Sequence, residues 1–461
     1  MTDHSNVFER VRDHLAARYE KCGIPDNRAI ADYLTSTMQL PMFFSSVQVK
    51  LSDKSLISTL KDAKNTTSKI KFFLKSFISG SVMLIVLVLH VFSGLKRREK
   101  VHIVFSLTQQ QVKSLNEIRE FLSESRFNMR ILNHHLILLE DRNSKQDFDG
   151  NTLLVRDSMC WLYMNTFTRF QKIHCLYDIF LEIFRSLLGI RRIRICLFRQ
   201  LIIDKQIFRH AQMNMTILSL STTQSHLQRL PISFYLAEGT RVPRYMFWYS
   251  DNSWVFEREN TFTAFDHSRY KRDFIDIHFC WSLEWQAYLE SFGMSSKIFA
   301  SGSILFYSQE TRHQMAQKSY DVLIFDVTPG VAMNEYDFYS QDALNSFYDG
   351  IKSAIDTSKA RGLKISIKNK RKLNQRLDTW AESNRASMLD PNANLYELVN
   401  EARLVIGLPL VSPIRIAKEL GVSCAYYYPD TSEEWILPLE HAGVPIFRKF
   451  SDLSEWISKN V

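Results

Sequence analysis

The chain has 461 residues, of which 45% are hydrophobic, so it is long for one domain and comfortable for two domains with an accessory segment. Its formal net charge of +9 suits an anionic partner, and because no nucleic-acid-binding motif is present, a membrane surface fits better than nucleic acid. The six cysteines show no Cys-x-x-Cys spacing and no accompanying histidine array, which argues against a disulfide framework and a zinc site and indicates a reducing compartment.

Residues 1–100 are predicted to form an accessory helical region. The first forty residues are charged and mixed, so no secretory signal is expected. The stretch Ser76–Leu95 holds 20 residues without Lys, Arg, Asp or Glu, which is just enough to cross the hydrocarbon of a bilayer. Its flanks are basic on both sides, so charge asymmetry gives no orientation. Three interpretations stay open: a helix dipping into or lying on the cytoplasmic leaflet, a membrane span, and a buried core helix.

Residues 101–308 are predicted to form a first α/β domain. We expect helices at 109–124 and around 157–190, and strands at 101–106, 129–132, 135–139, 215–220, 233–236, 245–249, 275–280 and 297–300. Within this region, residues 172–205 hold 7 basic and 3 acidic residues among apolar ones. This stretch is either an interfacial amphipathic helix or a core helix followed by a strand at 193–198.

Residues 320–461 are predicted to form a second α/β domain, after a polar link at 308–319. Its expected helices lie at 341–361, 371–384 and 395–402, and its expected strands at 321–326, 363–368, 386–389, 403–407 and 423–429. Helices of this length between strands imply right-handed crossovers and a parallel sheet that is covered on both faces. Ligands of such sheets bind at the carboxyl ends of the strands.

A strand-to-helix turn in this second domain has the features of an anion pocket. The strand ends at Gly407, Ser412 stands where an N-cap belongs, Pro413 takes the first helical position, and Gly421 provides the C-terminal stop. A helix that begins at the carboxyl end of a strand binds phosphate through its free N–H groups and its positive dipole end. An ordinary strand-to-helix turn is the alternative.

Charged residues after two other strands point to the same edge of the sheet. Lys368, Lys370 and Arg371 come at the end of one strand, where Arg grips phosphate oxygens in a fork and Lys acts as a point charge. Asp430 follows a strand that ends in three tyrosines and is either a ligand-binding residue or a turn residue. For the basic cluster the alternative is a solvated charge run.

Three sequence blocks resemble the bacterial polysaccharide biosynthesis PFTS-motif family. Pro409-Leu-Val-Ser-Pro413 stands where that family carries Pro-Phe-Thr-Ser, Val322–Pro329 resembles its Phe-Asp-Val-Thr-Pro segment, and Met246–Ser253 resembles its Trp-Tyr-Ser-acid-Asn-Ser segment. Leu410 and Val411 replace the motif's Phe and Thr, so a contact made by that threonine hydroxyl cannot be carried over. The resemblance implies a glycosyltransferase-like protein with two facing Rossmann-like domains, the arrangement called GT-B.

This resemblance implies transfer of a sugar from a nucleotide-sugar donor to a lipid-linked or glycan acceptor at the inner face of the cell membrane. Enzymes with this arrangement typically stabilise the leaving diphosphate with cations and a helix end instead of a metal, so no metal and no cofactor are expected. An acceptor hydroxyl must also lose its proton to a carboxylate or a histidine. Asp251 follows an expected strand and is the first candidate, and the further candidates are Glu238, Asp266 and His267.

Two other functions stay open. A transferase that moves a polyol phosphate from a nucleotide donor would need the same phosphate pocket and a similar membrane attachment. A noncatalytic partner in a polysaccharide assembly complex would fit the changed Leu410 and Val411 pair, but it would not need the retained Ser412, Pro413 and basic cluster.

Overall fold

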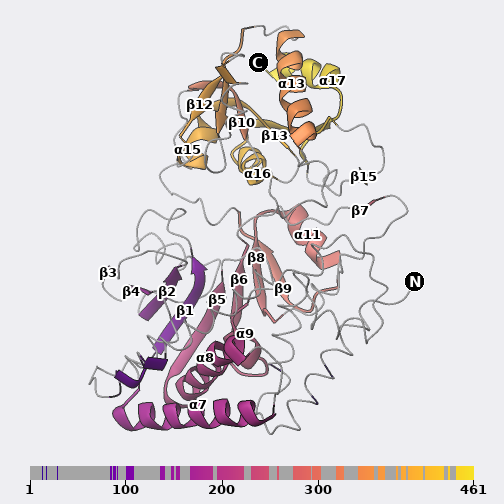
Figure 1. The fold of residues 1–461 in the computed structure, drawn as a ribbon. Helices are drawn as coiled ribbons and strands as arrows, with labels where there is room; N and C mark the ends of the chain where they lie inside the picture. Colours follow the sequence, from indigo (N-terminus) through magenta and orange to yellow (C-terminus); the bar gives the residue numbers. More distant parts are fainter. Residues whose placement is uncertain are drawn as a thin grey trace.

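The fold is taken from a computed structural model of the whole chain. It describes the following residues: 13, 17, 29, 84–85, 87–89, 91, 100–107, 135–140, 147–149, 152–155, 163, 167–189, 195–222, 230–248, 257–258, 274–291, 293–302, 318–325, 341–357, 362–368, 381–382, 386–390, 393–408, 411–429, 435–436 and 443–460. Within these residues the chain is an α/β protein with two large, mainly parallel sheets, one above the other in Figure 1.

The first sheet has eight strands in the order β3-β4-β2-β1-β5-β6-β8-β9. Neighbouring strands are parallel except for β3, which runs antiparallel to β4 at the edge. Without β3, the strands taken in chain order have the spatial order 3-2-1-4-5-6-7, and the order reverses between β1 and β5. The strands are β1 (Lys100–Leu107), β2 (His135–Glu140), β3 (Asp147–Asp149), β4 (Thr152–Val155), β5 (Thr216–Thr222), β6 (Arg244–Phe247), β8 (Ile277–Cys280) and β9 (Lys297–Ala300).

The second sheet has six parallel strands in the order β12-β11-β10-β13-β14-β16. In chain order this is 3-2-1-4-5-6, the arrangement of a doubly wound dinucleotide-binding fold, with its reversal between β10 and β13. The strands are β10 (Tyr320–Phe325), β11 (Ile365–Lys368), β12 (Ser387–Leu389), β13 (Ala402–Gly407), β14 (Ser423–Tyr427) and β16 (Ile446–Phe447). Their continuous apolar runs, such as Val322–Phe325, are buried, as expected for a sheet covered on both faces.

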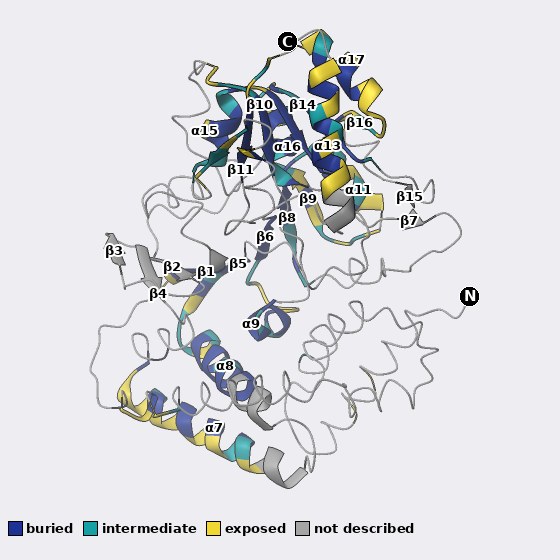
Figure 2. Cartoon of the chain, turned by 45° about the horizontal axis from the view of Figure 1, so that its top comes forward, coloured by how far each residue is buried: buried dark blue, intermediate teal, exposed yellow. Residues whose placement is uncertain are grey.

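Helices on the second sheet follow from right-handed crossovers. Helix α13 (Gln341–Thr357) lies in the connection from β10 to β11, and α16 (Ser412–Glu419) lies in the connection from β13 to β14. These two connections run in opposite directions across the sheet, so right-handed crossovers place the helices on opposite faces. Helix α17 (Phe450–Asn460) packs beside α13, where the Thr357 and Ser454 hydroxyls lie 3.1 Å apart, and α15 (Leu395–Asn400) lies beside α16 (Figures 1 and 2).

Three helices lie at the end of the first sheet that is farther from the second sheet. Helices α7 (Arg169–Gly189) and α8 (Ile195–Asn214) lie beside each other at the end of the molecule opposite the second sheet, with α9 (Ile232–Leu236) near them (Figure 1). Helix α11 (Leu283–Ser291) follows β8 at the other end, toward the second sheet. A short antiparallel pair, β7 (Glu257–Arg258) with β15 (Trp435–Ile436), joins a segment of each half.

Several expected elements in the first half need correction. Residues 233–236 were expected as a strand but lie in helix α9, which begins directly after Pro231. Residues 193–198 were expected as a strand in one interpretation, whereas α8 begins at Ile195. A single amphipathic helix over 172–205 is also wrong, because α7 ends at Gly189 and α8 starts a new helix.

The uncharged run at 76–95 is described only in part. Residues 84–85 and 87–89 are helical, with Leu87 and Val91 in the core and Ile85, Val88 and Leu89 exposed. In the described part of the chain, no helix is both long and apolar enough to cross a bilayer. The expected elements at 109–124, 129–132 and most of 371–384 lie outside the described residues.

Candidate functional site

The carboxyl edges of the two sheets face each other. Strand β8 ends at Cys280. Ser282, which directly precedes α11, and Glu284 in its first turn contact Arg415 of α16. Helix α16 itself begins beyond the carboxyl end of β13. Because nearly all strands within each sheet are parallel, these contacts bring the two carboxyl edges together, which is where ligands of such sheets bind.

The contact between the halves is an ion-pair network. One guanidinium nitrogen of Arg415 donates to Ser282 Oγ at 2.6 Å and to Glu284 Oε2 at 3.3 Å, and Lys418 Nζ donates to Glu284 Oε1. Arg415 is only 5% exposed, so its charge is held in a poorly solvated position where a partner is needed. Ser282 also accepts from the Trp285 N–H at 3.2 Å and thereby caps α11.

The pKa of Glu284 reflects this network. Burial by itself would raise the pKa of the carboxyl, but the hydrogen bond from Lys418 and the charges of Lys418 and Arg415 together hold it below its ordinary value. Glu284 is therefore ionised at neutral pH and joins two cations of the second half to the first.

Helix α16 begins differently from the expectation. Val411 is the N-cap residue, Ser412 is the first helical residue, and Pro413 is the second, so the prediction that Ser412 caps the helix is wrong. The structure gives no side-chain cap here, the Ile414 N–H donates to the Val411 carbonyl at 3.2 Å, and Pro413 has no N–H to offer. Fewer donors are thus available to an anion than the sequence suggested.

One glycine lies where β13 turns into α16, and a second lies just after α16. A side chain at Gly407 would place its Cβ 2.5 Å from Val411 Cγ2 and 3.0 Å from Ile414, so the first turn of α16 packs directly on the end of β13. Gly421 has φ +70° and follows the last turn, as expected for the glycine that stops the helix.

Lys368 lies in the same row of the second sheet as the end of β13. Phe325 of β10 pairs with Lys368 on one side and with Gly407 on the other, so Lys368 and Gly407 are two strand spacings, or about 10 Å, apart. Lys368 is 6% exposed, and burial lowers the pKa of its ammonium, partly offset by the Asp390 carboxylate. A bound phosphate would favour the charged form of this lysine.

Among the described residues, the carboxyl edge of the first sheet carries hydroxyls and aromatic rings. Ser221 and Thr222 end β5, and their hydroxyl oxygens are buried without a hydrogen-bond partner among the described residues. Trp248, which follows β6, donates to His278 Nδ1 at 3.1 Å and accepts at its carbonyl from the Trp281 indole at 2.8 Å. Trp248 therefore anchors the start of the segment that contains Asp251.

The structure places the predicted site residues unevenly. Lys368 and the start of α16 lie at the same sheet edge, whereas Glu238 is exposed in the turn after α9 that leads to the amino end of β6, away from the carboxyl edge. Six predicted site residues lie outside the described ones: Asp251, Asp266, His267, Lys370, Arg371 and Asp430.

Sequence reasoning missed Arg415, Glu284 and Ser282. Arg415 stands three residues after Ser412 on a helix whose neighbouring positions are apolar, and a charge buried among Ile414, Ile416 and Ala417 was the available signal. Glu284 carried no such signal, because its partner lies more than 130 residues away.

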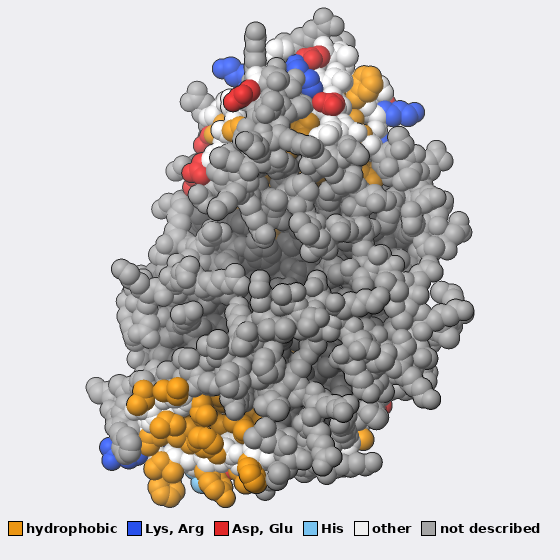
Figure 3. All heavy atoms as spheres, viewed as in Figure 1, with side chains coloured by type: hydrophobic (Ala, Val, Ile, Leu, Met, Phe, Trp, Pro, Cys, Tyr) orange, Lys and Arg blue, Asp and Glu red, His pale blue; other side chains and the backbone are white. Residues whose placement is uncertain are grey.

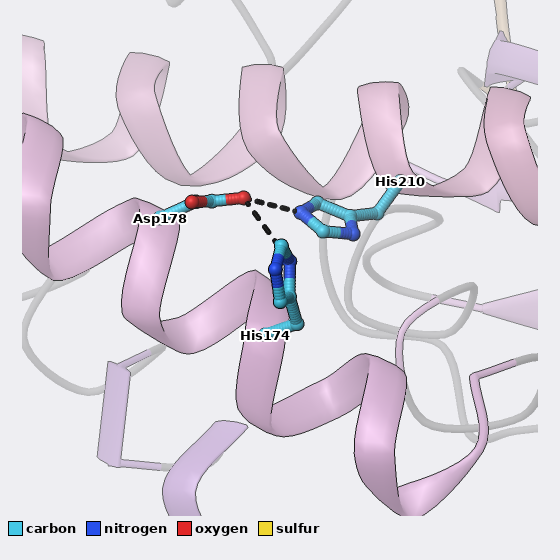
Figure 4. Close-up of side chains that lie close together, drawn as sticks. All are labelled: His174, Asp178 and His210. Carbon is cyan, nitrogen blue, oxygen red and sulfur yellow. Dashed lines mark hydrogen bonds and ion pairs between the residues drawn. The ribbon is translucent and has the colours of Figure 1, made fainter.

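One group of side chains in the described part of the chain has the types and spacing that a metal ion needs. His174, Asp178 and His210 each offer a ligand atom, and these atoms lie within 4.8 Å of one another (Figure 4). They belong to α7 and α8, at the end of the molecule opposite the second sheet, so they cannot act on a ligand at the facing sheet edges. Asp178 Oδ2 is 2.9 Å from His210 Nε2, which already joins the two helices.

The solved structures similar to this chain include a polymerase, a synthase and a glucosyltransferase. The wall teichoic acid polymerase TagF has a TM-score of 0.43 at 13% identity, with 86% of this chain and 88% of that chain covered. Trehalose 6-phosphate synthase from Burkholderia multivorans has a TM-score of 0.43 at 10% identity, covering 80% and 89%. For a UDP-glucosyltransferase from Polygonum tinctorium the values are 0.39, 10%, 78% and 89%.

Sequence comparison assigns the family. No curated protein matches the chain. The sequence profile described as "Polysaccharide biosynthesis PFTS motif protein" matches residues 182–457, which include Ser282, Glu284, Lys368 and the whole of α16. More than half of the chain is covered by this match, and the chain belongs to the polysaccharide biosynthesis PFTS motif family.

Proposed function

We propose that the protein is a GT-B-type glycosyltransferase that moves a sugar from a nucleotide-sugar donor to a lipid-linked or glycan acceptor. The observation that carries this proposal is the cationic carboxyl edge of the second sheet, which has Lys368 on one side of its order reversal and the start of α16 on the other. A doubly wound sheet binds nucleotides at this point, and a diphosphate there would meet positive charge.

The reaction is a substitution at the anomeric carbon of the donor sugar. The acceptor hydroxyl oxygen forms a bond to this carbon, the bond between the carbon and the diphosphate oxygen breaks, and the nucleoside diphosphate leaves with the electron pair. The hydroxyl proton passes to a base. Cations that face the diphosphate lower the barrier because negative charge develops there in the transition state.

Residues of the second half are proposed to hold the donor. Lys368, Lys370 and Arg371 would face the phosphates together with the first turn of α16, at Ser412 and Pro413, and Asp430 is a further candidate at the neighbouring strand end. Phosphate binding is expected to weaken as pH rises through the pKa of Lys368, since only the charged form attracts an anion.

Residues of the first half are proposed to act on the acceptor. Asp251 follows Trp248, whose side chain and carbonyl are fixed by His278 and Trp281, so it is our candidate for the base. Asp266 and His267 are the reserve candidates. The acceptor is proposed to lie at the inner face of the cell membrane.

Donor binding tests the proposal. Lys368→Met keeps the length of the side chain and removes its charge, and we expect it to weaken nucleotide-sugar binding at least tenfold in titration calorimetry, as loss of a charge-assisted contact of about 1.5 to 3 kcal/mol would do. The matched control is Lys352→Met, because Lys352 is a partly exposed lysine paired with Asp356 on α13. Equal affinities of the two variants would overturn the assignment of the donor site.

A panel of donors separates this proposal from its alternatives. Thermal shift with nucleotide sugars and with polyol nucleotides should show stabilisation by a nucleotide sugar that is lost in Lys368→Met. Stabilisation by polyol nucleotides alone would identify a polyol-phosphate transferase, and no stabilisation by any nucleotide would identify a noncatalytic partner.

A further inference from the structure

Exposed apolar side chains gather on two helical segments at one end of the molecule. Twelve large hydrophobic residues of the described part are exposed, and eight of them lie on α7 and on the segment 84–91. Figure 3 shows hydrophobic side chains gathered at this end, over the position of α7 in Figure 1. We call these eight residues the apolar face: Ile85, Val88, Leu89, Phe170, Ile173, Tyr177, Phe180 and Phe184.

The two segments of the apolar face lie beside each other. The Tyr163 hydroxyl is 3.2 Å from the Leu87 carbonyl and 3.4 Å from the Lys172 carbonyl, so one side chain touches both segments. Leu87 and Lys172 are fully buried, while the neighbours Val88 and Ile173 point out. Each segment thus has an inner side in the core and an outer apolar side.

The width of the apolar face favours a surface over a single partner helix. Along α7 the exposed residues alternate three and four positions apart, from Phe170 to Phe184, a spacing that alone would suit a narrow helix–helix seam. The neighbouring segment adds Ile85, Val88 and Leu89 beside this stripe, which broadens it beyond a seam. Contiguous exposed apolar patches of this kind mark membrane or protein contacts.

Charge on α7 is arranged so that no free carboxylate faces outward. Its two acidic residues are Asp178 and Glu182. Glu182 is buried and accepts hydrogen bonds from Lys205 and Gln206 of α8, and Asp178 pairs with His210 of α8, toward which it points in Figure 4. Among the described side chains of α7, the exposed ionisable ones are Arg169 and His174, a cation and an imidazole. The cation favours an anionic surface, and no unpaired carboxylate of α7 opposes it.

We infer that the apolar face docks on the anionic leaflet of a membrane, with its aromatic and aliphatic side chains in the interfacial region and without spanning the bilayer. The sequence around segment 84–91 agrees with this partner, because seven basic residues and one acidic residue flank the uncharged run between positions 69 and 100. The inference deepens the acceptor half of the proposed function and rests on it only in placing a lipid-linked acceptor near this surface.

Vesicle binding tests the inference with the full chain. Sedimentation with phosphatidylglycerol vesicles should bring down the wild-type protein, and Phe180→Glu/Phe184→Glu should lower its partition coefficient at least tenfold. Leu89→Asp, on the neighbouring segment, should act in the same direction. Phe450→Glu is the matched control, because Phe450 is also an exposed aromatic residue, 48% exposed, but lies on α17 of the other half.

Each other outcome would overturn the inference. Equal vesicle binding by the wild type and the double variant would exclude this face, and equal binding to phosphatidylcholine vesicles would exclude a role for anionic lipid. A wild-type dimer that becomes a monomer in the double variant, measured by light scattering without vesicles, would assign the face to a second copy of the chain.

Donor titration without vesicles separates this inference from the transferase proposal. Wild-type protein that binds a nucleotide sugar but no vesicles overturns the inference alone. Protein that binds vesicles but no nucleotide overturns the transferase proposal alone. Unchanged donor affinity in Phe180→Glu/Phe184→Glu shows that this variant is folded.

Discussion

The two sheets share one strand order but differ in the chemistry of their facing edges. In both sheets the order of the strands reverses beside the first strand, between β1 and β5 in one sheet and between β10 and β13 in the other. The edge of the second sheet presents Lys368 and the start of α16, whereas that of the first presents the hydroxyls of Ser221 and Thr222 and the anchored Trp248. We therefore propose that one topology serves an anion in the second half and an uncharged polar group in the first.

This difference teaches that strand order alone does not assign roles to the halves. A doubly wound sheet sets where a ligand binds, and side chains at the strand ends decide which ligand it is. Our assignment of the donor to the second half and the acceptor to the first follows from that contrast, and it can be broken by changes on either edge.

The largest effect is expected from Asp251→Asn, at the proposed base of the first half. The change keeps size and polarity but removes the proposed base, so turnover should fall by about 100-fold or more. Donor affinity should stay within about twofold, because the donor is assigned to the other half. Steady-state kinetics and calorimetry measure the two quantities, and an equal loss of turnover in Asp266→Asn instead would move the role to Asp266.

A smaller effect is expected from Gly407→Ala at the start of α16. The new methyl group would lie 2.5 Å from Val411 Cγ2, so the first turn of the helix must shift, and the free energy of unfolding should fall by about 1 to 3 kcal/mol. Donor affinity should fall with it.

Gly350→Ala is the matched control for that change. Its methyl group would meet the Tyr427 ring, so it too should destabilise the second half, but on the face of the sheet opposite α16. Denaturant unfolding and donor titration should show lost stability in both variants and weakened donor binding only in Gly407→Ala. Equal donor affinity in the two would contradict a role for this helix start.

The contact between the halves predicts a pH dependence of stability. The folded-state pKa of Glu284 lies below its ordinary value, so its contribution to stability is present above the ordinary pKa and is lost as pH falls through the folded pKa. Glu284→Gln should lower the free energy of unfolding by about 0.5 to 1 kcal/mol at neutral pH, a modest loss because the Lys418–Glu284 pair is partly exposed. The variant should also lose less stability than the wild type as the pH falls. Unfolding free energies between about pH 5 and 3 check this, and an unchanged slope in Glu284→Gln would contradict it.

The smallest effect is expected from Ser221→Ala. Its buried hydroxyl has no hydrogen-bond partner among the described residues, so removing it should leave the melting temperature unchanged or slightly raise it. If the acceptor uses this hydroxyl, KM for the acceptor rises while stability stays. A clear loss of stability would show that the hydroxyl is paired within the fold.

The alternation of strands and helices in the second half could be predicted because each strand there is a short apolar run between longer helical segments. The strands expected at 403–407 and 423–429 agree closely with the observed strands β13 and β14. Errors came where a short pattern conflicts with a longer one: Ile193–Phe198 alternates like a strand, yet it leads into the 20-residue helix α8, whose side chains Ile203, Ile207 and Ala211 are buried. Pro231 and packing likewise make the aromatic run 233–236 a helix.

The candidate site was less predictable than the fold, for a different physical reason. Lys368 could be found because it ends a strand, and local order is enough for that. The contacts of Arg415 and Glu284 depend on how two halves meet, which no local pattern contains. The His174, Asp178 and His210 group also joins two helices, so an expectation based on cysteine spacing could not detect it.

Ser282 has a consequence for how the two halves move. Its one hydroxyl both holds the first turn of α11 and receives the Arg415 guanidinium. Separating the halves removes that guanidinium and exposes the beginning of α11, while fraying of this turn removes the acceptor from Arg415. Separation of the two halves and local order at the start of α11 are therefore thermodynamically coupled, and amide hydrogen exchange at Trp285 would report on that separation.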